Sequence, residues 1–229
     1  MPMPDPPAPS ASDPASPNGL GLVYFPYLRG LAHELNNSLT GILGYAQLLA
    51  LGASEPGPAT EAREIETCSL RCRDLVALLG RCSRPEEGTL TYEPAALFED
   101  LVTLLGPPLR RRSLRLEVRR SGGASLLHGH PWSLRAALLG LAGMALVEPV
   151  PEGGRLVLTL RGEGSHAEID LGLPDREVAW VREQLDSGDS PDVRGGGNAG
   201  LARRALEGLG QKVTLEARAD GPCVVVGLR

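Results

Sequence analysis

A stripe of apolar residues at helical spacing runs through the first quarter of this sequence and limits the folds open to it. From Pro26 to Leu51 the apolar positions recur at steps of three and four: Leu28, Leu31, Leu35, Leu39, Ile42, Ala46 and Leu49. This spacing predicts an amphipathic helix with a heptad-like face. Pro26 suits the first turn, where its missing N–H carries no cost. The helix therefore needs a partner that covers its apolar face.

A second helix with the same need follows almost at once. The stretch 52–58, rich in Gly and Pro, ends the first helix, and residues 59–82 are again helical in pattern. Their apolar face consists of Ile65, Cys68, Cys72, Leu75 and Leu79. So short a connection makes an antiparallel hairpin, which alone leaves an apolar stripe exposed. Pairing of two hairpins into a four-helix bundle would bury the stripe, so we expect residues 23–85 to form a homodimer.

Residues 88–229 alternate between strand and helix patterns. Leu114, Leu116 and Val118 alternate with charged residues, as in a half-buried strand. Further strands are expected near residues 155–161, 166–171, 212–217 and 223–228, and helices near residues 94–105, 132–147 and 175–185 and after residue 200. Such a mixture predicts a layered α/β sandwich. The expected fold class is α+β, a helical hairpin followed by an α/β-sandwich domain.

Composition narrows the cellular setting. Residues 1–22 are rich in Pro, Ala and Ser, and we expect them to be a disordered tail. The net charge of −5 gives no basic footprint for nucleic acid, and no Lys/Arg run is long enough to suggest a membrane surface. No apolar run reaches the ~20 residues that cross a bilayer, and no signal peptide is visible. Four scattered cysteines fit neither a disulfide framework nor a metal site. We therefore expect a cytoplasmic protein with reduced thiols and no metal.

His33 stands on the opposite side of the first helix from the apolar stripe. At ~100° per residue it lies ~160° from Leu35, and Asn37, Thr40 and Gly44 share its side. Such small neighbours would let another protein approach the imidazole, and the adjacent Glu34 could hold one ring nitrogen protonated while the other acts as a nucleophile. On periodicity alone, a plain surface histidine beside a solvated acid is the simpler explanation.

The stretch from His33 to Leu49, HELNNSLTGILGYAQLL, resembles the phosphoacceptor box of sensor histidine kinases. The similarity continues through LLGRCSRP at Leu78–Pro85 and, in layout, over residues 25–229. It implies that His33 accepts phosphate, that Glu34 assists the transfer and that Asn37 positions water for phosphatase activity.

One residue of this box departs from the family, because Ser38 stands where a helix-bending Pro is usual. This puts the local kink in doubt and leaves the acceptor in place. The resemblance also implies a response-regulator receiver domain as partner, and we expect it to pack against Thr40, Gly41 and Gly44.

The second domain resembles the ATP-binding domain of the same family, but most motif residues are replaced. Met144 stands where the family has the Asn that holds Mg²⁺, and a thioether is a poor ligand for a hard cation. In the first glycine motif Asp170 matches the carboxylate that reads adenine and Gly172 is kept. Pro174 replaces the second Gly, and its ring would crowd a close backbone approach.

The second glycine motif is the loop that contains Gly196 and Gly200. With Arg194, this loop and the helix start after it could still cradle an anion. A flexible connector explains the loop about as well.

These features predict a phosphorelay protein of the histidine kinase superfamily. It would carry phosphate on His33 and exchange it with a response-regulator Asp, without efficient use of ATP. Two alternatives remain: an active or divergent kinase that holds ATP with Mg²⁺ through Asp170 and the glycine loop, and a non-enzymatic dimeric module that binds a receiver. The first interpretation expects no cofactor.

Overall fold

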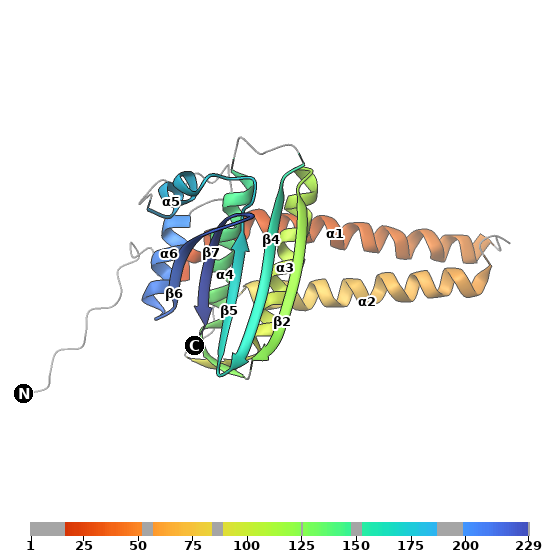
Figure 1. The fold of residues 1–229 in the computed structure, drawn as a ribbon. Coiled ribbons are helices and arrows are strands. Elements are labelled where there is room, and N and C mark those ends of the chain that lie inside the picture. The colour runs from red at the N-terminus through yellow and green to blue at the C-terminus, as the bar shows by residue number, and fades with distance from the viewer. Residues whose placement is uncertain are drawn as a thin grey trace, which may run out of the picture.

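Helices α1 (Pro17–Leu51) and α2 (Pro58–Ser83) form an antiparallel hairpin that projects from the remainder of the chain (Figure 1). The structure is a computed structural model that describes residues 17–51, 57–83, 89–124, 126–147, 153–186 and 199–228. The predicted hairpin is confirmed.

The start of the first helix differs from the prediction. Helix α1 begins at Pro17 rather than near Pro26, so residues 17–22, expected in the disordered tail, are helical. Pro17 occupies the first helical position, where a proline is tolerated, and the residues after it include several that are apolar. The rest of the expected tail, residues 1–16, lies outside the described residues.

The apolar stripe of α1 is divided between two surroundings. Leu31 is buried, and Gly41 lies so close to α2 that a methyl group added to it would be 3.1 Å from the Cys68 sulfur. Leu39 and Leu43, further round the helix, remain 49% and 60% exposed. On α2, Val76 is likewise 55% exposed. The single chain thus leaves large apolar side chains of both hairpin helices exposed.

Five strands make the main sheet of the second domain, in the order β2-β4-β5-β7-β6. They are β2 (Arg115–Ala124), β4 (Arg155–Gly164), β5 (His166–Gly172), β6 (Lys212–Arg218) and β7 (Gly221–Leu228). Only the β2–β4 pairing is parallel. A two-stranded antiparallel sheet, β1 (Leu90–Tyr92) with β3 (Leu127–Gly129), was not predicted, because three-residue strands are too short to show an alternating pattern.

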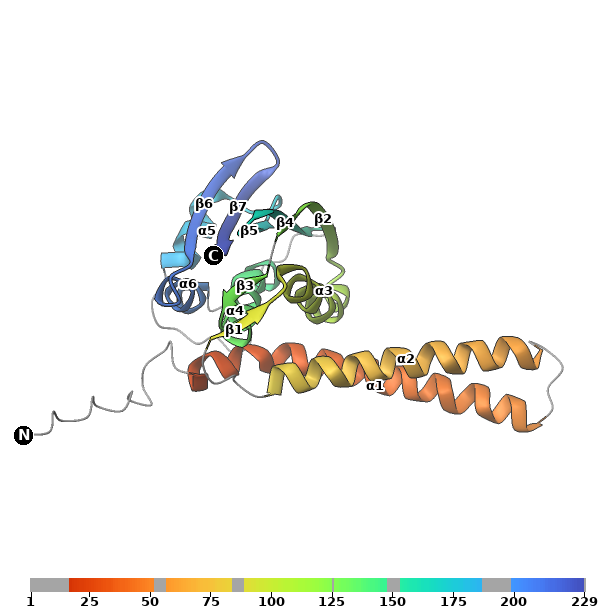
Figure 2. The ribbon, with the colours of Figure 1, turned by 90° about the horizontal axis from the view of Figure 1, so that it is seen from below.

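Helices cover one face of the main sheet. They are α3 (Pro94–Arg111), α4 (Pro131–Ala142), α5 (Val178–Asp186) and α6 (Ala199–Gly208), with a 3-10 turn η1 (Gly143–Leu146) after α4. Figure 2 shows the order of layers: the base of the hairpin, then α3, α4 and α6, then the sheet, whose far face carries no helix. The core between helices and sheet includes Leu158, Ile169 and Val224, all buried. This is the α/β sandwich that the sequence predicted.

Helix α3 runs past its predicted end at Leu105 to Arg111, although Pro107 and Pro108 lie within it. Both prolines are buried, and Pro107 packs on α1, where a methyl group on Gly30 would lie only 3.0 Å from its Cβ. Proline has a backbone φ that suits a helix. Packing against α1 therefore outweighs the two hydrogen bonds that the prolines cannot donate.

Three contacts hold the domain on the hairpin. The Tyr27 hydroxyl donates to the carbonyl oxygen of Leu139 at 2.8 Å, and burial raises the pKa of this phenol. The Trp132 indole donates to the carbonyl oxygen of Cys82 at 3.0 Å. Asp100 accepts from Arg81 of α2 at 2.6 Å and from Arg135 of α4 at 3.0 Å. Among the described residues, no helix is long and apolar enough to cross a membrane.

Candidate functional site

His33 projects from α1 into solvent, on the side expected from the helical period. Its Nδ1 lies 3.1 Å from the side-chain nitrogen of Asn37, one turn further along. With the amide nitrogen facing the ring, Nδ1 accepts and Nε2 carries the proton. If the amide turns over, its oxygen accepts from Nδ1–H and Nε2 keeps a free lone pair. Asn37 can therefore select the nitrogen that attacks an electrophile.

Glu34 is engaged elsewhere than expected. Its carboxylate accepts from Arg71 of α2 at 2.7 Å and from Arg110 of α3. The sequence led us to expect a contact between Glu34 and the His33 ring, but in the structure the ring contacts Asn37 instead. The reason is angular, because residue 34 points ~100° round the helix from residue 33, toward α2. Glu34 thus links α1 to both α2 and α3.

Of the three residues expected to receive a partner, two are accessible. Thr40 is exposed and donates its hydroxyl to the Asn36 carbonyl at 2.8 Å. A methyl group added to Gly44 would meet nothing within 4 Å. Gly41 instead faces Cys68 of α2, so its lack of a side chain serves helix packing.

A groove of about 670 Å³ lies beside this region, between α2 and α3. Glu34, Arg71 and Arg110 line its edge, and Leu75 and Val102 contribute apolar surface. The groove and the exposed side of α1 thus meet at Glu34.

The position expected to hold Mg²⁺ offers no oxygen ligand. Met144 lies in η1 and is fully buried. A buried thioether neither attracts nor neutralises a hard cation. No group of three or more His, Cys, Asp or Glu side chains in the described part of the chain could hold a metal ion.

Asp170, expected to read adenine, lies on the sheet face opposite the helices. Its neighbours along β5, Ile169 and Leu171, are buried in the core, and side chains alternate along a strand. The Asp170 carboxylate accepts from Arg161 at 2.9 Å and from Arg218 at 2.7 Å. Burial works against the charged form of Arg218, but its hydrogen bonds to Asp170 and Glu216 outweigh this and raise its pKa. The carboxylate is thus already paired with two cations.

The part of the second glycine motif that the structure describes lies away from Asp170, in the helical layer. Gly196 and Arg194 are outside the described residues, whereas Gly200 is buried in the first turn of α6, within the helical layer. A methyl group on Gly172 would lie 3.2 Å from the Cβ of Val157 in β4, so Gly172 serves close strand packing. Because Asp170 and Gly200 belong to opposite sides of the sheet, they do not form one nucleotide site. The described residues therefore do not fit Mg-ATP as the motifs implied.

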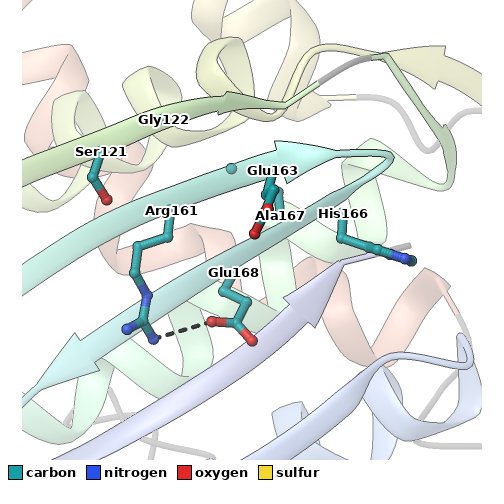
Figure 3. Close-up of a pocket in the computed structure, with 8 residues that line it drawn as sticks. Ser121, Gly122, Arg161, Glu163, His166, Ala167 and Glu168 are labelled. Carbon is teal, nitrogen blue, oxygen red and sulfur yellow. Dashed lines mark ion pairs between the residues drawn. The ribbon is translucent and has the colours of Figure 1, made fainter.

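The open face of the sheet has a hollow of its own, of about 400 Å³ (Figure 3). Arg161, Glu163, His166 and Glu168 line it, and Arg161 pairs with Glu168 at 3.1 Å. The residues that line this hollow belong to β2, β4 and β5, and the helical layer lies between that sheet and the hairpin (Figure 2). The hollow is therefore not part of the surface around His33.

Sequence reasoning missed the two arginines that pair with Glu34, the residue next to His33. Arg71 and Arg110 lie 37 and 76 residues from Glu34 in the chain, and no local pattern connects them. The one local signal available is that Arg110 belongs to three consecutive arginines, Arg110–Arg112, which the sequence analysis did not use.

Comparison with known proteins points to the same region. Residues 27–88 match the family described as the His Kinase A (phospho-acceptor) domain. The chain is 28% identical over 215 residues to the sensor histidine kinase AruS of Pseudomonas aeruginosa, a match that covers 84% of this chain and 21% of AruS. It is 32% identical over 135 residues to the sensory histidine kinase/phosphatase NtrB of Escherichia coli O157:H7, covering 58% of this chain and 38% of NtrB. The chain thus spans less than two fifths of either relative.

Among solved structures, the catalytic domain of the histidine kinase ThkA covers 61% of this chain and 94% of its own, with a TM-score of 0.48 and 14% identity. A bacterial phosphotransferase covers 92% of this chain and 97% of its own, with a TM-score of 0.42 and 15% identity.

Proposed function

We propose that this chain, a two-component transmitter core of the histidine kinase superfamily, carries phosphate on His33 and exchanges it with an aspartate of a response-regulator receiver domain. The observation that carries the proposal is the placement of His33 within the phospho-acceptor match, exposed, with one ring nitrogen held by Asn37. A nucleophile whose second nitrogen is oriented by a neighbour is what phosphoryl transfer needs.

The transfer step uses the turned-over orientation of the Asn37 amide, in which the amide oxygen faces Nδ1. With Nδ1–H held by the Asn37 oxygen, the Nε2 lone pair forms a bond to phosphorus as the bond between phosphorus and the aspartyl oxygen breaks. The electron pair of the broken bond leaves with the aspartate as a carboxylate, and the proton on Nδ1 stays on the ring. The reverse step returns phosphate to a receiver. The receiver would approach over Thr40 and Gly44, whose small side chains leave room beside the ring.

We propose that the chain does this without efficient use of ATP. Met144 supplies no oxygen for Mg²⁺, and without a metal the charge on the transferring oxygens is not neutralised. Asp170 is paired with Arg161 and Arg218 and lies across the sheet from Gly200. On this proposal no cofactor is required.

The attachment of the α/β domain supports the same view. A kinase domain that phosphorylates a histidine on the hairpin has to bring its nucleotide to that histidine. Here the contacts of Tyr27, Trp132 and Asp100 join the domain to the base of the hairpin at both helices, the first two buried and the last, with Arg81, partly buried. The domain is therefore better suited to act as a fixed neighbour of α1 than as a moving donor.

We further propose that the protein acts in the cytoplasm as a homodimer. The exposed side chains of Leu39, Leu43 and Val76 supply an apolar face for a second hairpin. Because His33 lies on another side of α1, pairing of two chains would leave it accessible.

The test uses the whole protein and a set of receiver domains phosphorylated with labelled acetyl phosphate and freed of the reagent. We expect acid-labile label to move to the protein, and His33→Ala to abolish it. His166→Ala, which removes another exposed histidine, should label normally. Label that persists in His33→Ala would refute the proposal. Binding of a receiver without any label would instead favour the non-enzymatic dimeric module.

An active or divergent kinase is the second candidate, because both curated relatives bear the name of sensor or sensory histidine kinases. Incubation with γ-labelled ATP and Mg²⁺ in the absence of a receiver separates the two. We expect no label on His33 and no Mg²⁺-dependent binding of ATP by titration calorimetry. Autophosphorylation would establish the kinase, and Asp170→Asn would then show whether the nucleotide depends on that carboxylate.

A further inference from the structure

Arginines gather within one helical turn of His33. Arg29 precedes it by four residues on α1, so the two side chains are neighbours on the helix surface. Arg111, at the end of α3, reaches the same turn from the other domain: a methyl group on Gly30 would lie 3.5 Å from a terminal nitrogen of its guanidinium. Arg110, next to it, pairs with Glu34. The phosphoacceptor thus lies beside positive charge from two domains.

Two of these charges are not neutralised by the protein. Arg29 and Arg111 are exposed, and among the described residues neither has an ion pair or a side-chain hydrogen bond. Glu34, the acid on this turn, is already shared by Arg71 and Arg110. The guanidinium groups of Arg29 and Arg111 are therefore free to bind an anion that arrives at His33.

The close approach of α3 to α1 depends on Gly30. A methyl group there would be 3.0 Å from the Cβ of Pro107, which is closer than side chains normally pack. The glycine lets the end of α3 lie directly against the turn that precedes His33. Arg111 is therefore positioned beside His33 by the packing of two helices and does not belong to a flexible loop.

We propose that Arg111 of the α/β domain, together with Arg29 of α1, forms a phosphoryl-binding site beside His33. The inference rests on the proposed function, because its ligand is the phosphoryl group that passes between His33 and a receiver. As the N–P bond forms and the bond to the aspartyl oxygen breaks, negative charge spreads over the three outer oxygens of the phosphoryl group. Guanidinium N–H groups are planar, permanently charged donors suited to such oxygens. The α/β domain would thus contribute to transfer through Arg111 without binding a nucleotide.

The first test avoids the unidentified receiver by using potassium phosphoramidate as phosphoryl donor to the full chain. Its P–N bond breaks as Nε2 of His33 bonds to phosphorus, and ammonia leaves with the electron pair. The initial rate of phosphohistidine formation is followed by phosphorus NMR. Arg111→Gln should lower this rate by about tenfold, a modest loss for one preorganised donor because the site is open to solvent. Arg29→Gln should lower it in the same direction, and Arg111→Lys should recover most of the rate because it keeps the charge.

Arg182→Gln is the matched control, since it removes an exposed arginine from α5 and should react like the wild type. A purely structural role for Arg111 would lower the urea midpoint in both Arg111→Gln and Arg111→Lys, without recovery by lysine. Equal rates in wild type and Arg111→Gln, or equal losses in Arg111→Gln and Arg182→Gln, would overturn the inference while leaving His33 as acceptor. If the wild type is not labelled, or His33→Ala labels equally, the proposed function fails with it.

A second measurement needs no transfer at all. Inorganic phosphate, titrated into the full chain, should shift the ring resonances of His33 in the wild type and in Arg182→Gln. The shift should require at least several-fold more phosphate in Arg111→Gln. Identical titration curves for Arg111→Gln and wild type would contradict a phosphoryl-binding site at this position.

Discussion

The amide of Asn37 meets the Nδ1 atom of His33 at 3.1 Å, and this contact leaves Nε2 as the ring nitrogen open to a partner. The neighbouring carboxylate, Glu34, is directed to Arg71 and Arg110 instead. The His33 ring is therefore contacted by an amide on its own face of the helix, while the Glu34 carboxylate links that helix to α2 and α3.

The open space beside His33 should be needed for a receiver to dock. Gly44→Arg should block phosphate transfer from a receiver, because a large charged side chain would stand on the docking face. Its helix should remain folded, since a side chain at Gly44 meets nothing within 4 Å. Gly80→Arg is a matched control on α2, also with nothing within 4 Å, and should transfer normally. Transfer rates and circular dichroism check both variants; normal transfer by Gly44→Arg would remove this face from the docking surface.

Gly41→Arg should behave differently from both glycine variants above. Its side chain would have to displace the Cys68 sulfur, 3.1 Å from the first added carbon, so the hairpin itself should be destabilised. We expect a loss of about 1–3 kcal/mol from overpacking, measured as a lower urea midpoint. An unchanged midpoint would show that residue 41 is not confined between the helices.

Self-association should depend on the exposed apolar face of the hairpin. Leu39→Lys and Val76→Lys place a charge where a second hairpin would bury apolar surface, so each should raise the dimer dissociation constant by at least tenfold. Sedimentation over a range of concentrations measures this. Thr67→Lys, an exposed position of α2 that lines the groove facing α3, should leave association unchanged. A wild-type chain that stays monomeric at tens of micromolar, a rough range for moderate affinity, would rule out the dimer.

The cluster at Asp100 should contribute strongly to stability. Asp100→Ala leaves the Arg135 guanidinium, only 4% exposed, without its carboxylate, and we expect a loss of about 3 kcal/mol in the free energy of unfolding. Asp74→Ala removes the partner of Arg73 in an exposed pair and should cost less than about 0.5 kcal/mol. Urea denaturation monitored by tryptophan fluorescence distinguishes them. Equal losses would mean that Arg135 finds another partner.

Stability should fall at alkaline pH. Burial raises the pKa of the Cys82 and Cys223 thiols from 9.0 to about 11 each. A raised pKa means that the native state holds its proton more tightly than the unfolded chain. This contribution is complete below pH 9 and is lost as the pH rises toward 11, at about 1.4 kcal/mol for each pKa unit.

The measurement is the free energy of unfolding in urea at pH 8 and at pH 10.5. The double variant Cys82→Ala/Cys223→Ala should start from a lower stability but fall less between these two values. Equal falls in wild type and double variant would show that other groups govern the alkaline limb.

The helical period in the sequence was enough to predict the hairpin and the exposed side of α1 that carries His33. The helical period could not predict contacts between distant segments. No local sequence pattern indicates that Arg110 reaches Glu34, or that Gly41 faces Cys68. The position of Asp170 was misjudged for another reason. Matching to a family motif gave it the role of reading adenine without regard to the strand pattern, whereas the alternation of Ala167, Ile169 and Leu171 in the core assigns Asp170 to the face opposite the helices. The strand pattern was the better guide there.

The hydrogen bond between Tyr27 and Leu139 has a consequence for how the chain is made. It joins segments 112 residues apart, so the base of α1 cannot be secured until α4 has left the ribosome. During that interval the apolar residues of α1 have only α2 to pack against, and the nascent hairpin is open to pairing with other chains. Order of synthesis therefore favours early association of hairpins, before the second domain closes on them.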